Sequence, residues 1–183
     1  MKKVGTQSIE TKRLLLRPFI KSDYQAMYDN WASRPNNILH VTWDVHQNPD
    51  TTRQSIARWV DCYQDLGFYK WAICLKETPE YAIGDISVVN KDEKINSCEV
   101  GYILGEVYWG QGLMTEALKA VLAFLLQEAG FNRVSAEFVT VNPASGRVME
   151  KAGMSCEGTL RQAKFHKGQV KDYSIYSILR SDL

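Results

Sequence analysis

The amino-acid sequence predicts an α/β (α+β) fold, and three observations support this prediction. A strongly apolar segment with helical spacing, residues 115–129, lies between segments with strand patterns. The N-terminal half is rich in strand patterns, and the end of the chain is typical of a hairpin. A long helix set among strands in one chain indicates a sheet covered by helices.

Each element follows from a local signal. Pro18 ends the first strand, Ser22 and Asp23 cap the first helix, and Gly130 and Gly153 end two later helices. The segment 30–49, rich in Pro, Asn and His, is expected to be irregular. Strands are expected at 11–19, 69–75, 82–89, 98–104, 133–141, 156–165 and 170–179, and helices at about 22–31, 51–66, 115–129 and 145–151.

Length and composition indicate one ordinary globular domain, which we expect to span residues 1–183. Apolar residues make up 45% of the chain and charged residues 23%. The net charge of +1 argues against sequence-independent binding to nucleic acid and against binding to an anionic membrane. Neither a signal peptide nor a membrane-spanning apolar run is recognised, so a cytoplasmic location is expected.

The four cysteines, at 62, 74, 98 and 156, are widely spaced and form no Cys-x-x-Cys pair. The spacing therefore indicates neither a zinc site nor a redox pair. Each cysteine has apolar neighbours in the sequence, and we expect all of them to be small buried hydrophobic residues in a reducing compartment.

The segment 98–115 combines a strand, a glycine-containing turn at Gly110-Gln111-Gly112 and the start of the apolar helix near Met114. This order leaves free backbone N–H groups at a helix N-terminus, where phosphates commonly bind. A Walker A loop would need Lys and Ser/Thr where Gln111 and Gly112 stand, and Thr115 occupies the third glycine position of the dinucleotide fingerprint. From the turn alone, an anion site and a simple tight turn are about equally favoured.

Four motifs carry a resemblance that spans residues 11–179. They are Arg13-Leu-Leu-Leu-Arg-Pro, Glu99-Val-Gly-Tyr with Tyr108-Trp-Gly-Gln-Gly-Leu-Met-Thr-Glu-Ala-Leu, Asn142-Pro-Ala-Ser-Gly-Arg-Val-Met-Glu-Lys-Ala-Gly-Met, and Glu157-Gly-Thr-Leu-Arg with Asp172. In this order and spacing the chain resembles the GNAT superfamily of N-acetyltransferases, in particular its RimJ/RimL-like branch of ribosomal-protein N-terminal acetyltransferases.

The resemblance implies a mixed, mostly antiparallel sheet flanked by helices and splayed at its central strand, where acetyl-CoA binds as co-substrate. In the family loop Gln/Arg-x-x-Gly-x-Gly/Ala, Trp109 takes the first position and Met114 the last, and both depart from the consensus. The backbone amides of 111–115 remain to hold the pyrophosphate. The cofactor-binding residues implied are Tyr102, Ile103, Leu104, Trp109, Gly110, Gln111, Gly112, Leu113, Met114, Thr115, Asn142 and Ser145.

The resemblance also implies catalytic roles. A backbone N–H of Ile103 or Leu104 would polarise the thioester carbonyl. Ser145 would protonate the departing thiolate, with Asn142 beside the pantetheine, although both residues also suit the capping of a short helix.

The general base is the least defined of the implied roles. The position at which the branch carries a Glu base holds Lys164, which leaves Glu99 and Glu157, and we favour Glu99. A lone Glu on a strand is also commonly just solvated, and a water chain can take the place of a base.

The predicted function is acetyl transfer from acetyl-CoA to a primary amine, with a protein N-terminus as one acceptor. A small-molecule amine acetyltransferase and an acyl-CoA-binding module without turnover are the alternatives, and a nucleotide-dependent enzyme is less favoured. His40, His46 and Trp43, in the irregular segment, are candidates to border the acceptor cleft. We expect no nucleic-acid or membrane partner, and the assembly is left open, with a homodimer among the options.

Overall fold

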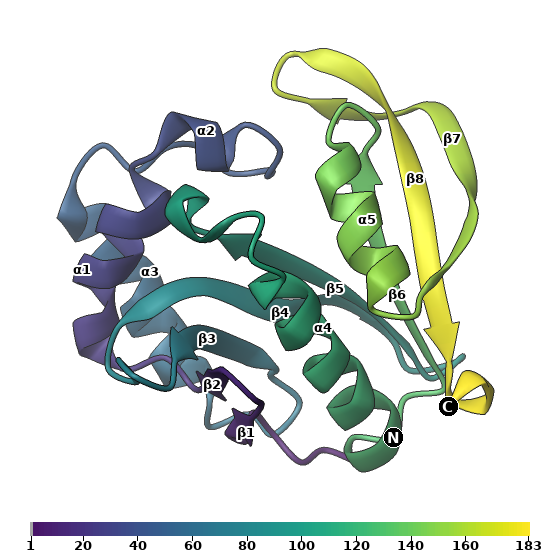
Figure 1. Cartoon of the computed structure of the whole chain (residues 1–183), viewed down its shortest axis with the longest axis horizontal. Coiled ribbons are helices and arrows are strands. Elements are labelled where there is room, and N and C mark those ends of the chain that lie inside the picture. Colours follow the sequence, from purple (N-terminus) through teal and green to yellow (C-terminus); the bar gives the residue numbers. More distant parts are fainter. Residues whose placement is uncertain (1) are drawn as a thin grey trace.

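The computed structural model describes residues 2–183, which are organised around one 8-stranded sheet in the order β1-β2-β3-β4-β5-β6-β8-β7 (Figure 1). Neighbouring strands are antiparallel except for β5 and β6, which are parallel. The predicted mixed, mostly antiparallel sheet is therefore confirmed. The strands are β1 (Ile9–Glu10), β2 (Leu14–Arg17), β3 (Lys70–Leu75), β4 (Ala82–Asp92), β5 (Ser97–Leu104), β6 (Arg133–Val139), β7 (Ser155–His166) and β8 (Gln169–Leu179).

Helices cover both faces of the sheet (Figure 1). The helices are α1 (Tyr24–Met27), α2 (Pro35–Ile38), α3 (Pro49–Cys62), α4 (Leu113–Ala123) and α5 (Pro143–Lys151), and wider turns at Tyr28–Ala32 and Phe124–Glu128 continue α1 and α4. Within residues 2–183, none of these helices combines the length and the apolarity that crossing a bilayer requires.

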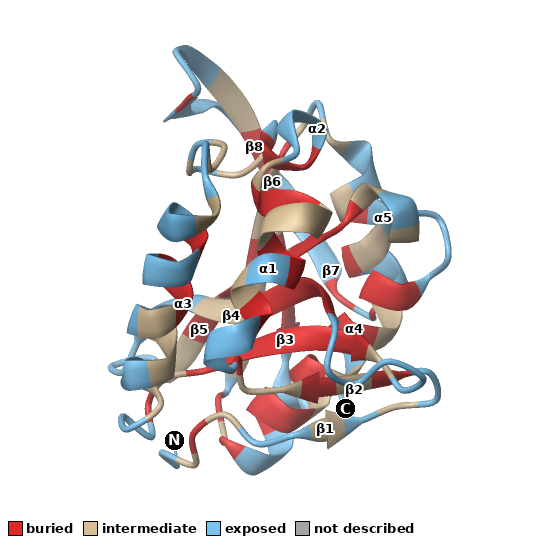
Figure 2. Ribbon diagram, turned by 90° about the vertical axis from the view of Figure 1, so that its left-hand side faces the viewer, coloured by how far each residue is buried: buried red, intermediate tan, exposed pale blue. Residues whose placement is uncertain are grey.

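The core has two parts, one on each face of the sheet. Alternation along a strand sends Trp71 of β3 to the face covered by α4 and α5, and Ala72 to the face covered by α1 and α3. Figure 2 shows the buried band that runs along β3, β4 and α4. Leu118 and Val121 of α4 are fully buried, and replacing a core leucine of this kind by alanine costs about 2–5 kcal/mol.

The structure extends and shifts several predicted elements. The first strand is shorter than predicted and pairs with β1 in a hairpin that the sequence pattern did not indicate. The irregular segment contains α2, which begins at Pro35, and proline is favoured at the first position of a helix. In α3 the side chain of Asn48 accepts a hydrogen bond from the backbone N–H of Thr51, which starts the helix earlier than expected.

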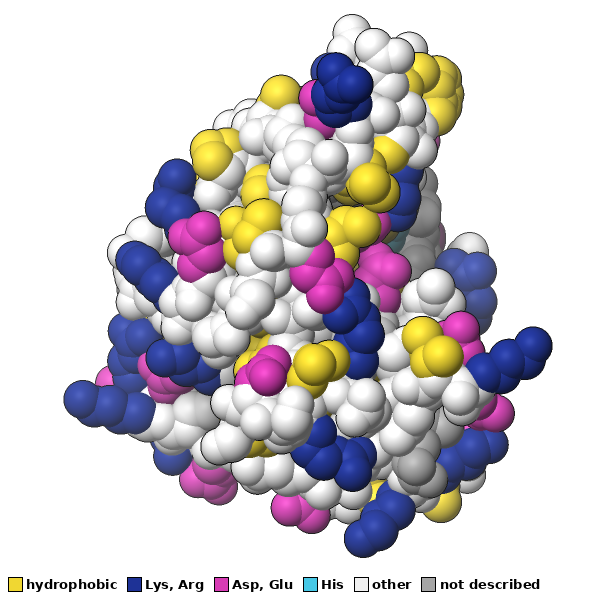
Figure 3. Space-filling view, turned by 90° about the vertical axis from the view of Figure 1, so that its right-hand side faces the viewer, with side chains coloured by type: hydrophobic (Ala, Val, Ile, Leu, Met, Phe, Trp, Pro, Cys, Tyr) yellow, Lys and Arg dark blue, Asp and Glu magenta, His cyan; other side chains and the backbone are white. Residues whose placement is uncertain are grey.

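The prediction that all cysteines are buried is wrong for two of them. Cys74 and Cys98 are buried, whereas Cys62 and Cys156 are exposed. Cys156 lies on β7, the outer strand of the sheet, and nearly all side chains of that strand are exposed. On the face of the molecule seen in Figure 3, charged side chains of both signs alternate with small hydrophobic spots.

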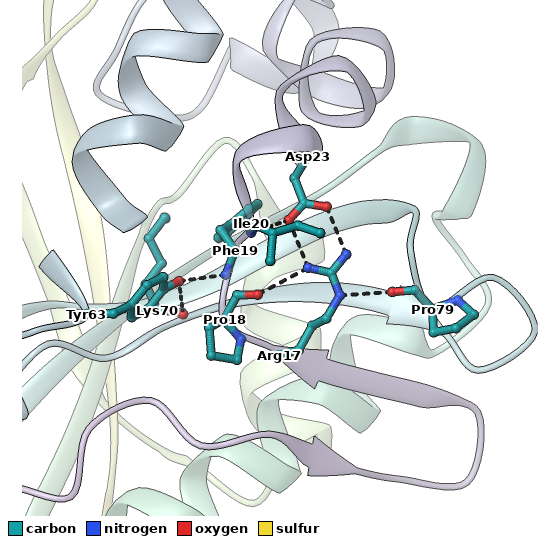
Figure 4. Close-up of polar contacts among 8 residues, drawn as sticks. All are labelled: Arg17, Pro18, Phe19, Ile20, Asp23, Tyr63, Lys70 and Pro79. Atoms are coloured by element: carbon teal, nitrogen blue, oxygen red, sulfur yellow. Dashed lines mark hydrogen bonds and ion pairs between the residues drawn. The ribbon is translucent and has the colours of Figure 1, made fainter. Parts of the chain in front are cut away.

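A buried ion pair anchors β2 to α1 (Figure 4). The Arg17 guanidinium donates from both terminal nitrogens to the Asp23 carboxylate, at 2.8 Å each, and from Nε to the carbonyl of Pro79 at 2.9 Å. Asp23 is almost completely buried. Removing one member of such a pair leaves a buried charge without a partner, which costs about 3–5 kcal/mol.

Candidate functional site

The site begins where β5 and β6 separate. The two strands pair at Ser97–Arg133, Cys98–Val134 and Glu99–Ser135, and no further pairs form although both strands continue. Beyond Glu99 the two backbones therefore diverge and leave an opening in the sheet. The opening had been predicted near residues 102–104, and these residues form its β5 side.

The backbone of β5 presents alternate N–H groups to the opening. Gly105 donates its N–H to the carbonyl of Ile83 on β4 at 2.8 Å. In an antiparallel ladder this bond fixes the alternation, so the N–H of Ile103 points to β4 and that of Leu104 points away from it. The carbonyl of Leu104, which faces the same way, accepts a hydrogen bond from the indole of Trp109 at 2.7 Å. Of the two predicted donors, Leu104 faces the opening.

The glycine-containing turn ends in a row of free amides. Gly110 and Gly112 both have φ of +74°, a conformation that favours glycine. The first intrahelical bond of α4 runs from the N–H of Glu116 to the carbonyl of Gly112 at 3.1 Å. Among residues 2–183, the backbone N–H groups from 110 to 115 have no hydrogen-bond partner. This row at a helix N-terminus fits the pyrophosphate of coenzyme A.

A carboxylate in the first turn of α4 is held away from this row. Glu116 accepts hydrogen bonds from the hydroxyl of Thr11, from the backbone N–H of Arg13 and from Arg13 Nε, at 2.7, 2.8 and 2.7 Å. Partial burial raises the pKa of Glu116, but these hydrogen bonds outweigh it and leave the pKa below its usual value. Glu116 is therefore a paired anion on the side of Arg13.

The start of α5 is tied to β5 across the opening. Tyr102 donates from its hydroxyl to the carbonyl of Ser145 at 3.1 Å. Asn142 occupies the N-cap position, but its side chain makes no cap hydrogen bond and instead donates from Nδ2 to Ser145 Oγ at 3.0 Å. Because the oxygen accepts from Asn142, the hydroxyl hydrogen of Ser145 remains available for donation.

A connected cavity of about 1450 Å³ passes through the opening. All of the predicted cofactor-binding and catalytic residues line it except Gln111. The side chain of Gln111 is exposed and donates to the carbonyl of Val107 at 3.1 Å. Gln111 therefore contributes to the row of amides through its backbone N–H alone.

The cavity continues to the other face of the sheet. Ile103 packs into the core beside α1 and α3, and alternation along β5 places Glu99 on the same face. Burial raises the pKa of Glu99, Glu137 raises it further, and Lys164 lowers it. On the same face the Lys70 ammonium lies 2.7 Å from Asp85 and 4.0 Å from the centroid of the Trp59 ring.

The irregular segment borders this side as predicted, since His40, Trp43 and His46 line the cavity. His46 Nδ1 is hydrogen-bonded to the hydroxyl of Thr52 at 2.8 Å, and its ring lies 5.2 Å from that of Trp43. Burial lowers the pKa of both histidines, and His166 lowers that of His40 further. Neutral imidazoles are therefore favoured here.

The turn between β7 and β8 meets the irregular segment above the cavity. His166 Nε2 donates to the carbonyl of Leu39 at 3.2 Å, and its Nδ1 accepts from the hydroxyl of Tyr173 at 3.1 Å. Lys167 donates to the carbonyl of Trp43 at 2.6 Å and lies 3.0 Å from Asp44. We refer to these contacts of His166 and Lys167 with residues 39–44 as the bridge.

Glu157, the alternative base, lies outside the cavity. Its carboxylate accepts two hydrogen bonds from the guanidinium of Arg133, at 2.5 and 2.6 Å, and one from the hydroxyl of Ser177 at 2.7 Å. These contacts lower the pKa of Glu157 to about 2. A carboxylate that holds its charge so strongly is a poor acceptor of protons at neutral pH.

Several charged residues around the cavity were not predicted from the sequence. Arg147 and Lys151, four residues apart on α5, line the cavity, and within residues 2–183 they have no carboxylate partner. Their spacing of four residues indicates that they share one face of α5, but it does not indicate that this face lines the cavity. The same holds for Lys70, Asp85 and Glu137, which become neighbours only through the sheet.

Comparison with known proteins agrees with this geometry. Residues 13–155 match the family described as Acetyltransferase (GNAT) domain. A ribosomal-protein-serine acetyltransferase from Escherichia coli (strain K12) is 32% identical over 132 residues, which cover 72% of each chain. The uncharacterized N-acetyltransferase YoaA from Bacillus subtilis (strain 168) is 29% identical over 175 residues, 94% of this chain and 96% of YoaA.

Solved structures share the fold. An acetyltransferase of the GNAT family from Bacillus anthracis superposes with a TM-score of 0.84 at 24% identity, over 96% of this chain and 99% of that one. RimL, a ribosomal-protein acetyltransferase in complex with coenzyme A, gives a TM-score of 0.82 at 21% identity, over 94% and 98% of the two chains. From the family match and the Escherichia coli relative, the chain belongs to the GNAT family of N-acetyltransferases, enzymes that transfer the acetyl group of acetyl-CoA.

Proposed function

We propose that this enzyme acetylates the N-terminal amine of a protein, using acetyl-CoA bound in the opening between β5 and β6. The observation that carries the proposal is the row of free amides from 110 to 115, which adjoins a cavity that continues through the sheet to Glu99. The relative from Escherichia coli is named a ribosomal-protein-serine acetyltransferase, and this supports a protein acceptor.

Acetyl-CoA supplies the activated acetyl group, and the chain supplies position and charge. The amides at 110–115 hold the pyrophosphate. The N–H of Leu104 faces the opening and stabilises the negative charge that develops on the carbonyl oxygen. These interactions raise the rate because they keep the thioester in one orientation beside the acceptor.

Two side chains move protons. Glu99 takes a proton from the acceptor ammonium, so that the nitrogen lone pair becomes free to attack. Ser145, oriented by Asn142, donates its hydroxyl hydrogen to the departing thiolate and regains a proton, directly or through water, from the nitrogen that becomes the amide. Glu99 lies on the face of the sheet covered by α1 and α3, whereas Ser145 lies on the face covered by α4 and α5, which fits one acting on the acceptor and the other on the leaving group.

We also propose a domain organisation, a location and an assembly for the protein. Residues 1–183 act as one acetyltransferase domain, supported by a single sheet whose strands extend from Ile9 to Leu179. The enzyme works in the cytoplasm as a monomer or a homodimer, and light scattering after size-exclusion chromatography distinguishes the two states.

An acceptor screen tests the proposal. The protein is incubated with acetyl-CoA and either short peptides with N-terminal Ser or Ala or a panel of small amines, and released thiol is measured. We expect thiol release with peptides and thermal stabilisation by coenzyme A. Binding of coenzyme A without thiol release from any acceptor would identify an acyl-CoA-binding module, and stabilisation by ATP or NAD instead would reject the proposal entirely.

A small-molecule amine is the second candidate acceptor, and the bridge favours it. Contacts of His166 with Leu39 and of Lys167 with Asp44 partly enclose the acceptor side, as expected of a site for a compact ligand. Turnover confined to small amines in the same screen would support this candidate over a protein N-terminus.

A further inference from the structure

The carboxylates that line the acceptor side differ in one respect. Three of them have a lysine partner, whereas Glu99 has neither an ion pair nor a side-chain hydrogen bond among residues 2–183. The three pairs are Asp44 with Lys167, Asp85 with Lys70, and Glu137 with Lys164. An incoming ammonium therefore meets one carboxylate that no lysine neutralises.

Glu99 and Glu137 stand on opposite sides of the opening. Glu99 is the last residue of β5 that pairs with β6, and its partner there is Ser135. Glu137 lies two residues beyond Ser135, so alternation places its side chain on the same face of the sheet. Two carboxylates in this position repel each other, and Glu137 raises the pKa of Glu99.

Lys164 reaches this place from a distorted part of β7. The pairing of β7 with β8 is irregular between Leu160 and Lys164, and Gln162 has φ of +49°. Irregularities of this kind redirect side chains next to functional sites. The Lys164 ammonium forms an ion pair with Glu137 and lies 5.3 Å from the centroid of the Tyr173 ring.

We propose that Glu137 and Lys164 are positioning residues for acetyl transfer, which act by keeping Glu99 as the carboxylate that receives the acceptor ammonium. Lys164 binds Glu137, so Glu137 does not compete for the ammonium. One N–H bond of the ammonium breaks as its proton passes to a Glu99 oxygen, and the neutral amine keeps the electron pair for attack. Glu99 later returns the proton to water. This inference rests on the proposed function.

Other charged groups line the same cavity and contribute to the electrostatic surroundings of Glu99. Arg58 of α3, His40, His46 and Asp44 of the irregular segment, and the Lys70–Asp85 pair of β3 and β4 all line it. Among the charged groups, Glu137 and Lys164 are the two that shift the pKa of Glu99. Since the shifts have opposite signs, the two residues are distinguishable by experiment.

The predicted signature is a pair of opposite displacements in the pH profile. Replacing Lys164 by Met removes a nearby positive charge, so the acidic limb of kcat/KM moves to higher pH. Replacing Glu137 by Gln removes a nearby negative charge, so the limb moves to lower pH. A purely structural role would lower activity without moving the limb in either direction.

The experiment measures kcat/KM against pH with the best peptide or amine from the acceptor screen. The variants are Lys164→Met, Lys164→Arg, Glu137→Gln and Glu99→Gln, and Lys171→Met is the matched control. Lys171 pairs with Lys164 across β7 and β8, but it lies outside the cavity and its ammonium contacts Gln169. Stabilisation by coenzyme A verifies that each variant is folded.

We expect Glu99→Gln to lose about 100-fold in kcat/KM, as removal of a general base does. Lys164→Arg should keep the wild-type profile, and Lys171→Met should not differ from wild type. Unchanged profiles in Lys164→Met and Glu137→Gln, or displacements in the same direction, would overturn this inference while acetyl transfer itself stands. A wild-type protein that acetylates no acceptor would overturn the proposed function, and this inference with it.

Discussion

Arg13 and Glu116 form an ion pair beside the free backbone amides of residues 110–115, with Arg13 Nε 2.7 Å from Glu116 Oε2. Arg13 also donates from its terminal nitrogen to the carbonyl of Gln111 at 3.0 Å. A free carboxylate in the first turn of α4 would repel a diphosphate, although it suits the helix dipole. The pair resolves this conflict, since it neutralises Glu116 and fixes the turn.

Replacing Arg13 by Ala should therefore weaken acetyl-CoA binding more than it affects the chemistry. Loss of a partly exposed ion pair costs about 1 kcal/mol, which corresponds to a rise of about fivefold in KM for acetyl-CoA. We expect kcat to change little, as measured by steady-state kinetics. Lys12→Ala is the matched control, and an equal rise in KM in that variant would show that only general charge matters.

A side chain at Gly112 should block the cofactor. The positive φ of Gly112 strains any other residue by about 1–2 kcal/mol, and Gly153, with φ of +97°, imposes a similar strain away from the turn. Both Gly112→Val and Gly153→Val should lower the melting temperature. Only Gly112→Val should weaken coenzyme A binding, by about tenfold or more in calorimetry. Equally tight binding in both variants would contradict the assigned role of the amides.

Ser145→Ala should lower kcat by about 100-fold, the usual contribution of a positioned proton donor, with little change in the KM for acetyl-CoA. The alanine leaves the backbone carbonyl that Tyr102 contacts, so the start of α5 should keep its position. Ser145→Thr retains a hydroxyl and serves as the control. An alanine variant as fast as wild type would remove Ser145 from the mechanism.

Glu157 should stabilise the fold in a pH-dependent way. Its pKa is lowered to about 2 in the folded state, so its stabilising contribution is complete above about pH 4.5 and is lost as the pH falls toward 2. The difference in melting temperature between wild type and Glu157→Gln should shrink over that range. Glu93→Gln, in the exposed turn after β4, is the control and should show no such trend.

The glycine-containing turn could be predicted from the sequence because its signals are local. A strand, two glycines and an apolar helix follow one another between residues 98 and 123, and these elements alone place free amides at a helix N-terminus. The opening beside the turn was predicted from the family resemblance, because the sequences of β5 and β6 carry no signal that their pairing is lost. Which N–H of β5 faces the opening depends on the register with β4, which no local pattern encodes.

The remaining part of the site depends on contacts between distant residues. Arg13 and Glu116 are 103 residues apart in the chain, and Glu137 and Lys164 are 27 apart. Both arginines of the first motif were noted in the sequence, but only the fold shows that Arg13 contacts the glycine-containing turn while Arg17 anchors α1. Charged residues carry no periodic signal that reveals their partners, and for that reason these pairs were missed.

The bridge between the β7–β8 turn and residues 39–44 has a consequence for the order of events in a cell. Because the contact of Lys167 with Asp44 partly encloses the acceptor side, the proposed protein acceptor would reach Glu99 as a free, extended end. A terminus already folded against its own protein could not enter in this way. Acetylation of a protein would then have to precede the packing of its first residues, while the nascent end is still extended.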